Sequence, residues 1–120
     1  MKTIVIDDEP WMLRHFCETC AGVEGIELAD KFRNPLLALK YAEENPVELA
    51  FVDVEMPQLN GPETAKGLME RRPEIQIVFI SAYAKSSIEA MHDLPVSGYL
   101  RKPYNREDLQ AIVDKITGTV

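Results

Sequence analysis

Cysteine is scarce in this sequence, which has only two cysteines, Cys17 and Cys20, in 120 residues. Their C-x-x-C spacing occurs in some redox and metal motifs. A redox pair, however, needs the start of a helix, and a metal site needs two further ligands. The segment WMLRHFCETC instead indicates the middle and end of a helix, with His15 as a poor third ligand. The sequence therefore favours structural or incidental cysteines.

Long hydrophobic runs and an excess of positive charge are also lacking. The uncharged apolar runs are far too short to span a bilayer, and the amino end lacks the basic head and apolar stretch of a signal peptide. We therefore expect no membrane contact and a cytoplasmic location. The chain has 13 Lys and Arg residues against 20 Asp and Glu, a net charge of −7. Because nucleic acid binding depends on Lys and Arg that neutralise phosphates, we expect no direct nucleic acid contact by this domain.

What is present is a regular alternation of apolar runs and amphipathic segments, in a length that fits one domain over residues 1–120. Strands are expected at residues 3–7, 25–32, 47–54, 75–81 and 97–100. Helices are expected at residues 9–21, 34–45, 61–72, 85–93 and 105–117. The near-continuous apolar centre of residues 47–54 suits a strand buried on both faces. This pattern predicts a doubly wound α/β fold of (βα)5 type, a parallel sheet with helices on both faces. Among the common doubly wound topologies, we expect the flavodoxin-like sandwich, whose five-stranded parallel sheet has the order 2-1-3-4-5.

Local features support these helices. Asn34 and Asn105 stand where helix caps are expected. The first expected helix carries the apolar residues Trp11, Met12, Phe16 and Ala21 close to helical spacing, and for Trp11 either a packing or a surface role is expected.

Chemically distinctive side chains stand at the ends of the predicted strands. Asp7 and Asp8 end the first strand, and Asp53 lies near the end of the third. In this strand order the first and third strands are neighbours across the switch point, where ligands bind beyond the carboxyl ends. Ser81 ends the fourth strand and Lys102 follows the fifth, so both should reach the same edge of the sheet.

Three carboxylates in one pocket need a compensating cation. Two unit charges ~4 Å apart repel by about 4 kcal/mol at an effective dielectric of about 20. Lys102 is one candidate cation, and Mg²⁺, which favours a few oxygen ligands and works alongside phosphate, is another. An acidic pair at a strand end can also be a solvated loop or sit at a helix N-terminus. The added hydroxyl and ammonium favour phosphoryl chemistry on a carboxylate nucleophile.

The segments IVIDDEP, FVDVEMPQLNG, VFISAY and SGYLRKPY resemble, in order, the motifs of bacterial response regulator receiver domains. The resemblance covers essentially the whole chain. It implies that Asp53 is the phosphoacceptor. It also implies a Mg²⁺ site formed by Asp8, Asp53 and the backbone carbonyl of Glu55, with Asp7 acting through water.

The resemblance assigns further roles beside the phosphoacceptor. Ser81 and Lys102 would bind phosphoryl oxygens, and the bond before Pro103 is cis in the family. Tyr99 matches an aromatic residue that moves with the hydroxyl residue when the domain is phosphorylated. Glu55 and Tyr83 occupy variable positions that influence how fast water attacks, and we expect this acidic, bulky pair to slow dephosphorylation. Asn60, where an aspartate is common, is expected to affect only a turn.

The resemblance also implies partners. A sensor histidine kinase or phosphotransfer protein would supply the phosphoryl group. An effector domain or downstream protein would read the face formed by residues 85–93, 97–100 and 105–117, through which a homodimer is also possible. A transcriptional output is expected. The chain would catalyse only its own phosphotransfer and autodephosphorylation, and is in that sense not an enzyme.

Three other functions remain open at this point. A phosphatase with an aspartyl-phosphate intermediate would place its nucleophile after the first strand and carry a cap or longer core. A flavin carrier of the same topology needs a first loop that cradles phosphate, which the segment DDEP would repel. An unphosphorylated interaction module commonly loses part of the acid, hydroxyl and lysine set, which is complete here.

Overall fold

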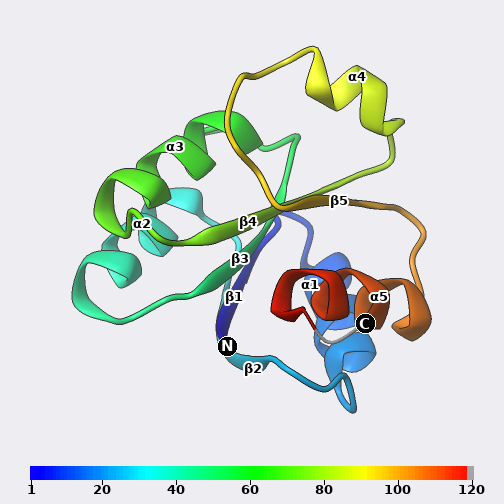
Figure 1. Ribbon diagram of the computed structural model, residues 1–120. Coiled ribbons are helices and arrows are strands. Elements are labelled where there is room, and N and C mark those ends of the chain that lie inside the picture. The colour runs from blue at the N-terminus through cyan, green and yellow to red at the C-terminus, as the bar shows by residue number, and fades with distance from the viewer. Residues whose placement is uncertain (119–120) are drawn as a thin grey trace.

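The fold is a five-stranded parallel sheet in a computed structural model that describes residues 1–118 (Figure 1). The strands are β1 (Lys2–Ile6), β2 (Glu27–Phe32), β3 (Leu49–Asp53), β4 (Gln76–Ser81) and β5 (Gly98–Arg101). The helices are α1 (Pro10–Cys20), α2 (Pro35–Glu44), α3 (Gly61–Arg71), α4 (Lys85–Glu89) and α5 (Arg106–Thr117). The strand order β2-β1-β3-β4-β5 confirms the predicted topology. The end of the predicted domain, residues 119–120, lies outside the described residues.

Alternation along each strand divides the core into two layers. On β1, Ile4 and Ile6 pack with buried residues of α2, α3 and α4, whereas Val5 packs with α1 and α5. Figure 1 shows the same division, with α2, α3 and α4 on one side of the sheet and α1 and α5 on the other. The central strand β3 is buried along its whole length, as its apolar sequence predicts. Strand β2 lies at one edge and is largely exposed.

Three helices begin at an asparagine cap. The Asn34 side chain accepts a hydrogen bond from the Leu36 N–H. Asn105 forms a reciprocal capping box with Asp108, as predicted for a cap at this position. Asn60 forms a second capping box with Glu63. Asn60 is therefore a helix cap that fixes the start of α3. The sequence had indicated only a turn residue at this position.

Helix α4 is shorter than predicted, because it ends at Glu89 and not near residue 93. The reason lies in the following residues. Pro95 disfavours helical backbone at Leu94, and the Leu94 N–H donates to the His92 side chain at 3.0 Å instead of to a helical carbonyl. The chain between α4 and β5 is therefore a connection shaped by side-chain contacts.

Only some of the apolar residues at helical spacing in the first helix are buried. Met12, Leu13 and Phe16 are its buried residues, whereas Trp11 is 62% exposed and Ala21 lies outside the helix and is exposed. The Trp11 indole N–H donates to a Glu9 carboxylate oxygen at 2.9 Å, which gives the exposed indole a polar partner. Of the packing and surface roles left open for Trp11, the structure shows the surface role.

Candidate functional site

The carboxyl ends of β1, β3, β4 and β5 bring the predicted site residues together at one edge of the sheet. Oxygen atoms of Asp7, Asp8 and Asp53 lie within 4.8 Å of one another. Asp7, Asp53 and Ser81 are 2%, 4% and 3% exposed, although all are polar. Buried polar side chains need polar partners to offset the loss of water. These side chains lie at the switch point, where the strand order brings the first and third strands together.

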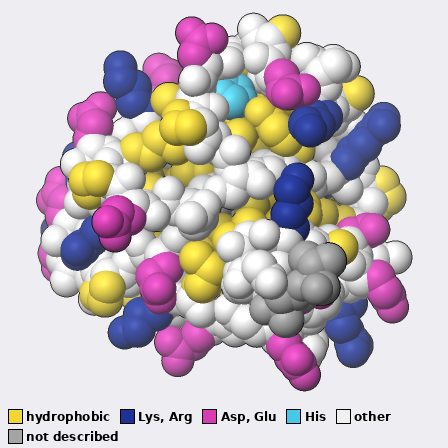
Figure 2. Space-filling model, in the orientation of Figure 1, with side chains coloured by type: hydrophobic (Ala, Val, Ile, Leu, Met, Phe, Trp, Pro, Cys, Tyr) yellow, Lys and Arg dark blue, Asp and Glu magenta, His cyan; other side chains and the backbone are white. Residues whose placement is uncertain are grey.

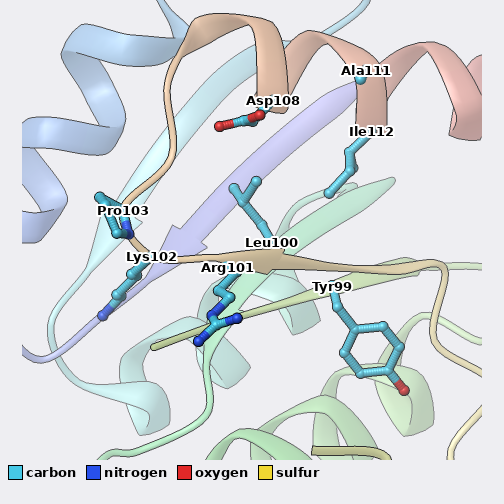
Figure 3. Close-up of a pocket in the computed structure, with 8 residues that line it drawn as sticks. All are labelled: Tyr99, Leu100, Arg101, Lys102, Pro103, Asp108, Ala111 and Ile112. Carbon is cyan, nitrogen blue, oxygen red and sulfur yellow. The ribbon is translucent and has the colours of Figure 1, made fainter. Parts of the chain in front are cut away.

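Lys102 provides the positive charge of the site. Its Nζ atom lies 3.3 Å from Asp7 Oδ2 and 3.4 Å from Asp53 Oδ1, so one ammonium contacts both buried carboxylates. Its backbone N–H donates to the Ser81 carbonyl at 2.8 Å, and its bond to Pro103 is cis. Figure 3 shows Lys102 extending toward the end of β1 and Tyr99 extending in the opposite direction.

The start of α3 comes very close to the backbone of the Asp53 strand. A Cβ atom on Gly61 would lie 2.7 Å from Val54 Cα and 2.9 Å from the Asp53 carbonyl oxygen. Both distances are shorter than side chains tolerate, and the neighbours are backbone atoms that cannot swing aside. Glycine at this position therefore lets α3 support the residue that carries the central carboxylate.

Burial makes Asp53 an unusually weak acid, with a raised pKa. Desolvation and the neighbouring Asp7 charge raise the pKa of Asp53 to about 7, although Lys102 opposes the shift. Burial also raises the pKa of Asp7, despite the Glu9 N–H that donates to its Oδ1 at 3.1 Å and the contact with Lys102. One ammonium therefore does not fully compensate this group of acids.

Lys102 itself remains an ammonium. Burial alone would lower its pKa, but Asp53 and Asp7 outweigh that effect and hold the pKa above its usual value. The side chain can therefore donate hydrogen bonds to an anion while it stays paired with the carboxylates.

A pocket of about 430 Å³ opens above these groups, and Glu55, Ser81 and Tyr83 are among the residues that line it. The Ser81 hydroxyl oxygen accepts a hydrogen bond from the Tyr83 N–H at 3.0 Å. At the exposed mouth, the hydrogen bond and charge of Glu55 raise the pKa of the Tyr83 phenol. The predicted lifetime pair thus lines one pocket, and its kinetic effect stays a prediction.

The donor set fits a hard divalent cation. Among residues 1–118, Asp7, Asp8 and Asp53 form the single group of three or more His, Cys, Asp or Glu side chains placed to share a metal ion. All of its donor atoms are carboxylate oxygens, which suit Mg²⁺ and not a soft metal. The raised pKa values of Asp7 and Asp53 indicate negative charge that an added cation would compensate.

The C-x-x-C segment forms no such site. The Cys20 thiol donates to the Cys17 carbonyl at 3.4 Å, and the His15 ring nitrogen Nε2 lies 3.2 Å from the Tyr104 carbonyl oxygen. Both cysteines are free thiols on α1. These contacts agree with the interpretation of the cysteines as structural or incidental.

The predicted switch residue Tyr99 has one contact that the sequence did not indicate. The His92 Nε2 atom lies 3.1 Å from the Tyr99 hydroxyl oxygen, so the predicted switch tyrosine has a histidine partner. The sequence offered no sign of it, because His92 lies in the irregular connection after α4, where no periodicity places a side chain.

No helix in the described part of the chain is both long and apolar enough to cross a membrane.

Comparisons with known proteins find relatives in sequence and in fold. The transcriptional regulatory protein YpdB of Escherichia coli K12 is 26% identical over 123 residues, which cover 97% of this chain and 47% of that protein. The crystal structure of the response regulatory domain of MrkE from Klebsiella pneumoniae superposes with a TM-score of 0.84 at 27% identity, covering 99% of this chain and 97% of that one. The chain spans about half the length of the curated relatives it matches.

A third structure, the CheX–CheY–BeF3–Mg complex from Borrelia burgdorferi, has a TM-score of 0.84 at 18% identity over 98% of this chain and 89% of that one, which shows the shared fold alone. The family model of the response regulator receiver domain matches residues 3–114. Since that match covers nearly the whole chain and includes every strand end of the acidic pocket, the chain belongs to the response regulator receiver domain family.

Proposed function

We propose that the chain is a phosphorylation-driven signalling switch that accepts a phosphoryl group on Asp53. The observation that carries the proposal is the Lys102 ammonium, which contacts both Asp7 and Asp53 at the floor of an open acidic pocket. A phosphohistidine of a sensor histidine kinase or phosphotransfer protein, or a small phosphodonor, would supply the group. Receiver domains are signalling switches, so turnover of an external substrate is not proposed.

The residues divide the transfer between them. An Asp53 carboxylate oxygen attacks phosphorus, and the bond from phosphorus to the donor's nitrogen or oxygen breaks, so that the donor leaves with the bonding electrons. Lys102 and the Ser81 hydroxyl donate hydrogen bonds to the phosphoryl oxygens. Asp7, Asp8, Asp53 and the Glu55 carbonyl would hold Mg²⁺, which when bound supplies further positive charge beside those oxygens.

Phosphorylation would act on the surface through Ser81 and Tyr99. The phosphoryl group adds roughly −1.5 to −2 charges, by analogy with other phosphorylated side chains. Ser81 would exchange its contact with the Tyr83 N–H for a phosphoryl oxygen, and Tyr99 would move with it. The α4-β5-α5 face would then change, including the pocket between β5 and α5 in Figure 3.

That face is the proposed contact for an effector domain, a downstream protein or a second copy of the chain. A transcriptional output is supported by relatives that are transcriptional regulators about twice as long as this chain. The net charge of −7 supports an output in which this domain itself does not contact nucleic acid.

Treatment with acetyl phosphate and Mg²⁺ tests the proposed function. Intact-protein mass analysis should show the addition of one phosphoryl group, which a chelator of divalent ions should suppress because the acidic pocket then lacks its second cation. A chain whose mass does not change, or one that gains the same mass in the presence of the chelator, would contradict the proposal.

The pair at the pocket mouth predicts a second kinetic result. Glu55 and Tyr83 line the same pocket, and Glu55 is close enough to raise the pKa of the Tyr83 phenol, so we expect the pair to restrict the approach of water to a group on Asp53. Glu55→Ala and Tyr83→Ala should each shorten the phosphoryl lifetime several-fold, as followed by the decay of the phosphorylated mass. Glu74→Ala, which removes an exposed carboxylate before β4, serves as the control. Unchanged lifetimes in both mouth variants would contradict this role.

A further inference from the structure

His92 lies on the connection between α4 and β5 and makes two polar contacts through its ring. Its Nδ1 atom accepts a hydrogen bond from the Leu94 N–H at 3.0 Å, and its Nε2 atom lies 3.1 Å from the Tyr99 hydroxyl oxygen. The His92 side chain is half-buried. Figure 2 shows hydrophobic side chains exposed among charged ones on this view of the molecule. A single side chain thus joins the backbone of the connection to the predicted switch residue.

The two contacts indicate which nitrogen of the neutral ring carries the proton. A backbone N–H can only donate, so Nδ1 must be the unprotonated acceptor. In the neutral imidazole the proton is then on Nε2, which donates it to the Tyr99 oxygen. Both ring nitrogens of His92 are therefore used, and rotation of Tyr99 away from His92 leaves the Nε2–H without this partner.

The Tyr99 ring is held on its other sides as well. The Phe79 ring lies edge-on to His92, with centroids 4.9 Å apart, and lies 6.2 Å from the Tyr99 ring. The Lys85 Nζ atom of α4 is 5.5 Å from the Tyr99 ring centroid. Partial burial and the Glu89 carboxylate raise the pKa of the Tyr99 phenol, so it stays a neutral hydroxyl.

We propose that His92 is a positioning residue that holds Tyr99 in the orientation seen here, and that phosphorylation of Asp53 must break the His92–Tyr99 hydrogen bond before Tyr99 can move. The inference rests on the proposed function, because it assigns a cost to one step of that switch. It also places part of the control of this receiver domain in the connection after α4, away from the phosphoryl site.

One neutral hydrogen bond changes such an equilibrium by about two- to tenfold. Removing it should favour the phosphorylated arrangement by that factor. By linkage, a ligand that selects the phosphorylated arrangement should bind more tightly by the same factor.

Beryllofluoride with Mg²⁺, a mimic of the phosphoryl group, is the ligand for the test. In His92→Asn the side-chain oxygen can still accept from the Leu94 N–H, as in other turns closed by asparagine, but the shorter side chain does not reach Tyr99. His92→Phe keeps a ring beside Phe79 and removes both polar contacts. Each variant should bind beryllofluoride about two- to tenfold more tightly than the original chain. Thermal melts establish that both are folded.

A Tyr99→Phe background gives the matched control, because the partner hydroxyl is then absent. In that background His92→Asn should leave beryllofluoride affinity unchanged, as a double-mutant cycle requires of a direct contact. Equal or weaker binding by the His92 variants, or the same gain in both backgrounds, overturns the role of His92. An original chain that binds no beryllofluoride overturns the proposed function itself.

Nitrogen NMR of the unmodified chain gives a second test that needs no variant. The His92 ring should show a protonated Nε2 and an unprotonated Nδ1, and addition of beryllofluoride with Mg²⁺ should shift the Nε2 resonance. The opposite tautomer, or an Nε2 resonance that does not respond to bound beryllofluoride, overturns the inference.

Discussion

The Asp53→Asn chain should take up no phosphoryl group from acetyl phosphate and Mg²⁺, whereas the original chain should gain one. Asparagine keeps the shape of the side chain but replaces the attacking carboxylate oxygen with an amide, which is a far weaker nucleophile. It also removes one of the two carboxylates that Lys102 contacts, 3.4 Å from its Nζ atom. Intact-protein mass analysis over the same time course measures the loss.

The same chemical change at an exposed acid controls for altered charge. Asp30→Asn, in the exposed edge strand β2, should be phosphorylated like the original chain. Phosphorylation of the Asp53→Asn chain at the original rate and extent would remove Asp53 from its proposed role.

The Asp53→Asn chain should also be more stable than the original chain at pH 8 without Mg²⁺, by roughly 4 kcal/mol, because a difference of one pKa unit corresponds to about 1.4 kcal/mol. In the folded chain the pKa of Asp53 is raised from 3.8 to about 7, chiefly because the side chain is buried. The folded state therefore holds this proton more tightly than the unfolded state. The contribution of Asp53 to the free energy of unfolding is therefore fully present below about pH 4, and it is lost as the pH rises from there through 7. An amide at this position does not ionise, so it loses no stability as the pH rises.

Urea denaturation at pH 4 and pH 8, without divalent ions, measures this difference. The gain from Asp53→Asn should be small at pH 4 and large at pH 8, while Asp30→Asn should change the free energy of unfolding by no more than about 0.5 kcal/mol at either pH. A gain that is independent of pH, or a variant that is less stable at pH 8, would mean that burial does not raise the pKa of Asp53 in the folded chain.

The site was predictable because the topology fixes where strand ends meet. Apolar runs predicted the strands, and the order β2-β1-β3-β4-β5 brings Asp7 and Asp53 to neighbouring ends at the switch point. Sequence reasoning therefore needed no side-chain geometry to collect the acids and Lys102 at one edge. That Lys102 contacts both Asp7 and Asp53 depends on side-chain positions, which only the structure supplies.

Contacts outside the regular elements could not be predicted. The Leu94 N–H donates to His92, which lies beyond the end of α4 although the sequence predicted a helix through residue 93. The partnership of His92 with Tyr99 follows from the path of the same connection. The sequence also left the role of Trp11 open between packing and the surface. Its position on α1 faces solvent, where Glu9 accepts from its indole N–H.

Locating the phosphoryl group by peptide mass analysis tests the central claim most directly. The original chain would be treated with acetyl phosphate and Mg²⁺, digested under conditions that preserve acyl phosphates, and its peptides fragmented. The pocket geometry predicts one modified residue, Asp53, because its buried carboxylate lies beside both Lys102 and the acidic pair. A phosphoryl group found on Asp8, Ser81 or any residue outside the pocket, with Asp53 unmodified, would contradict the account.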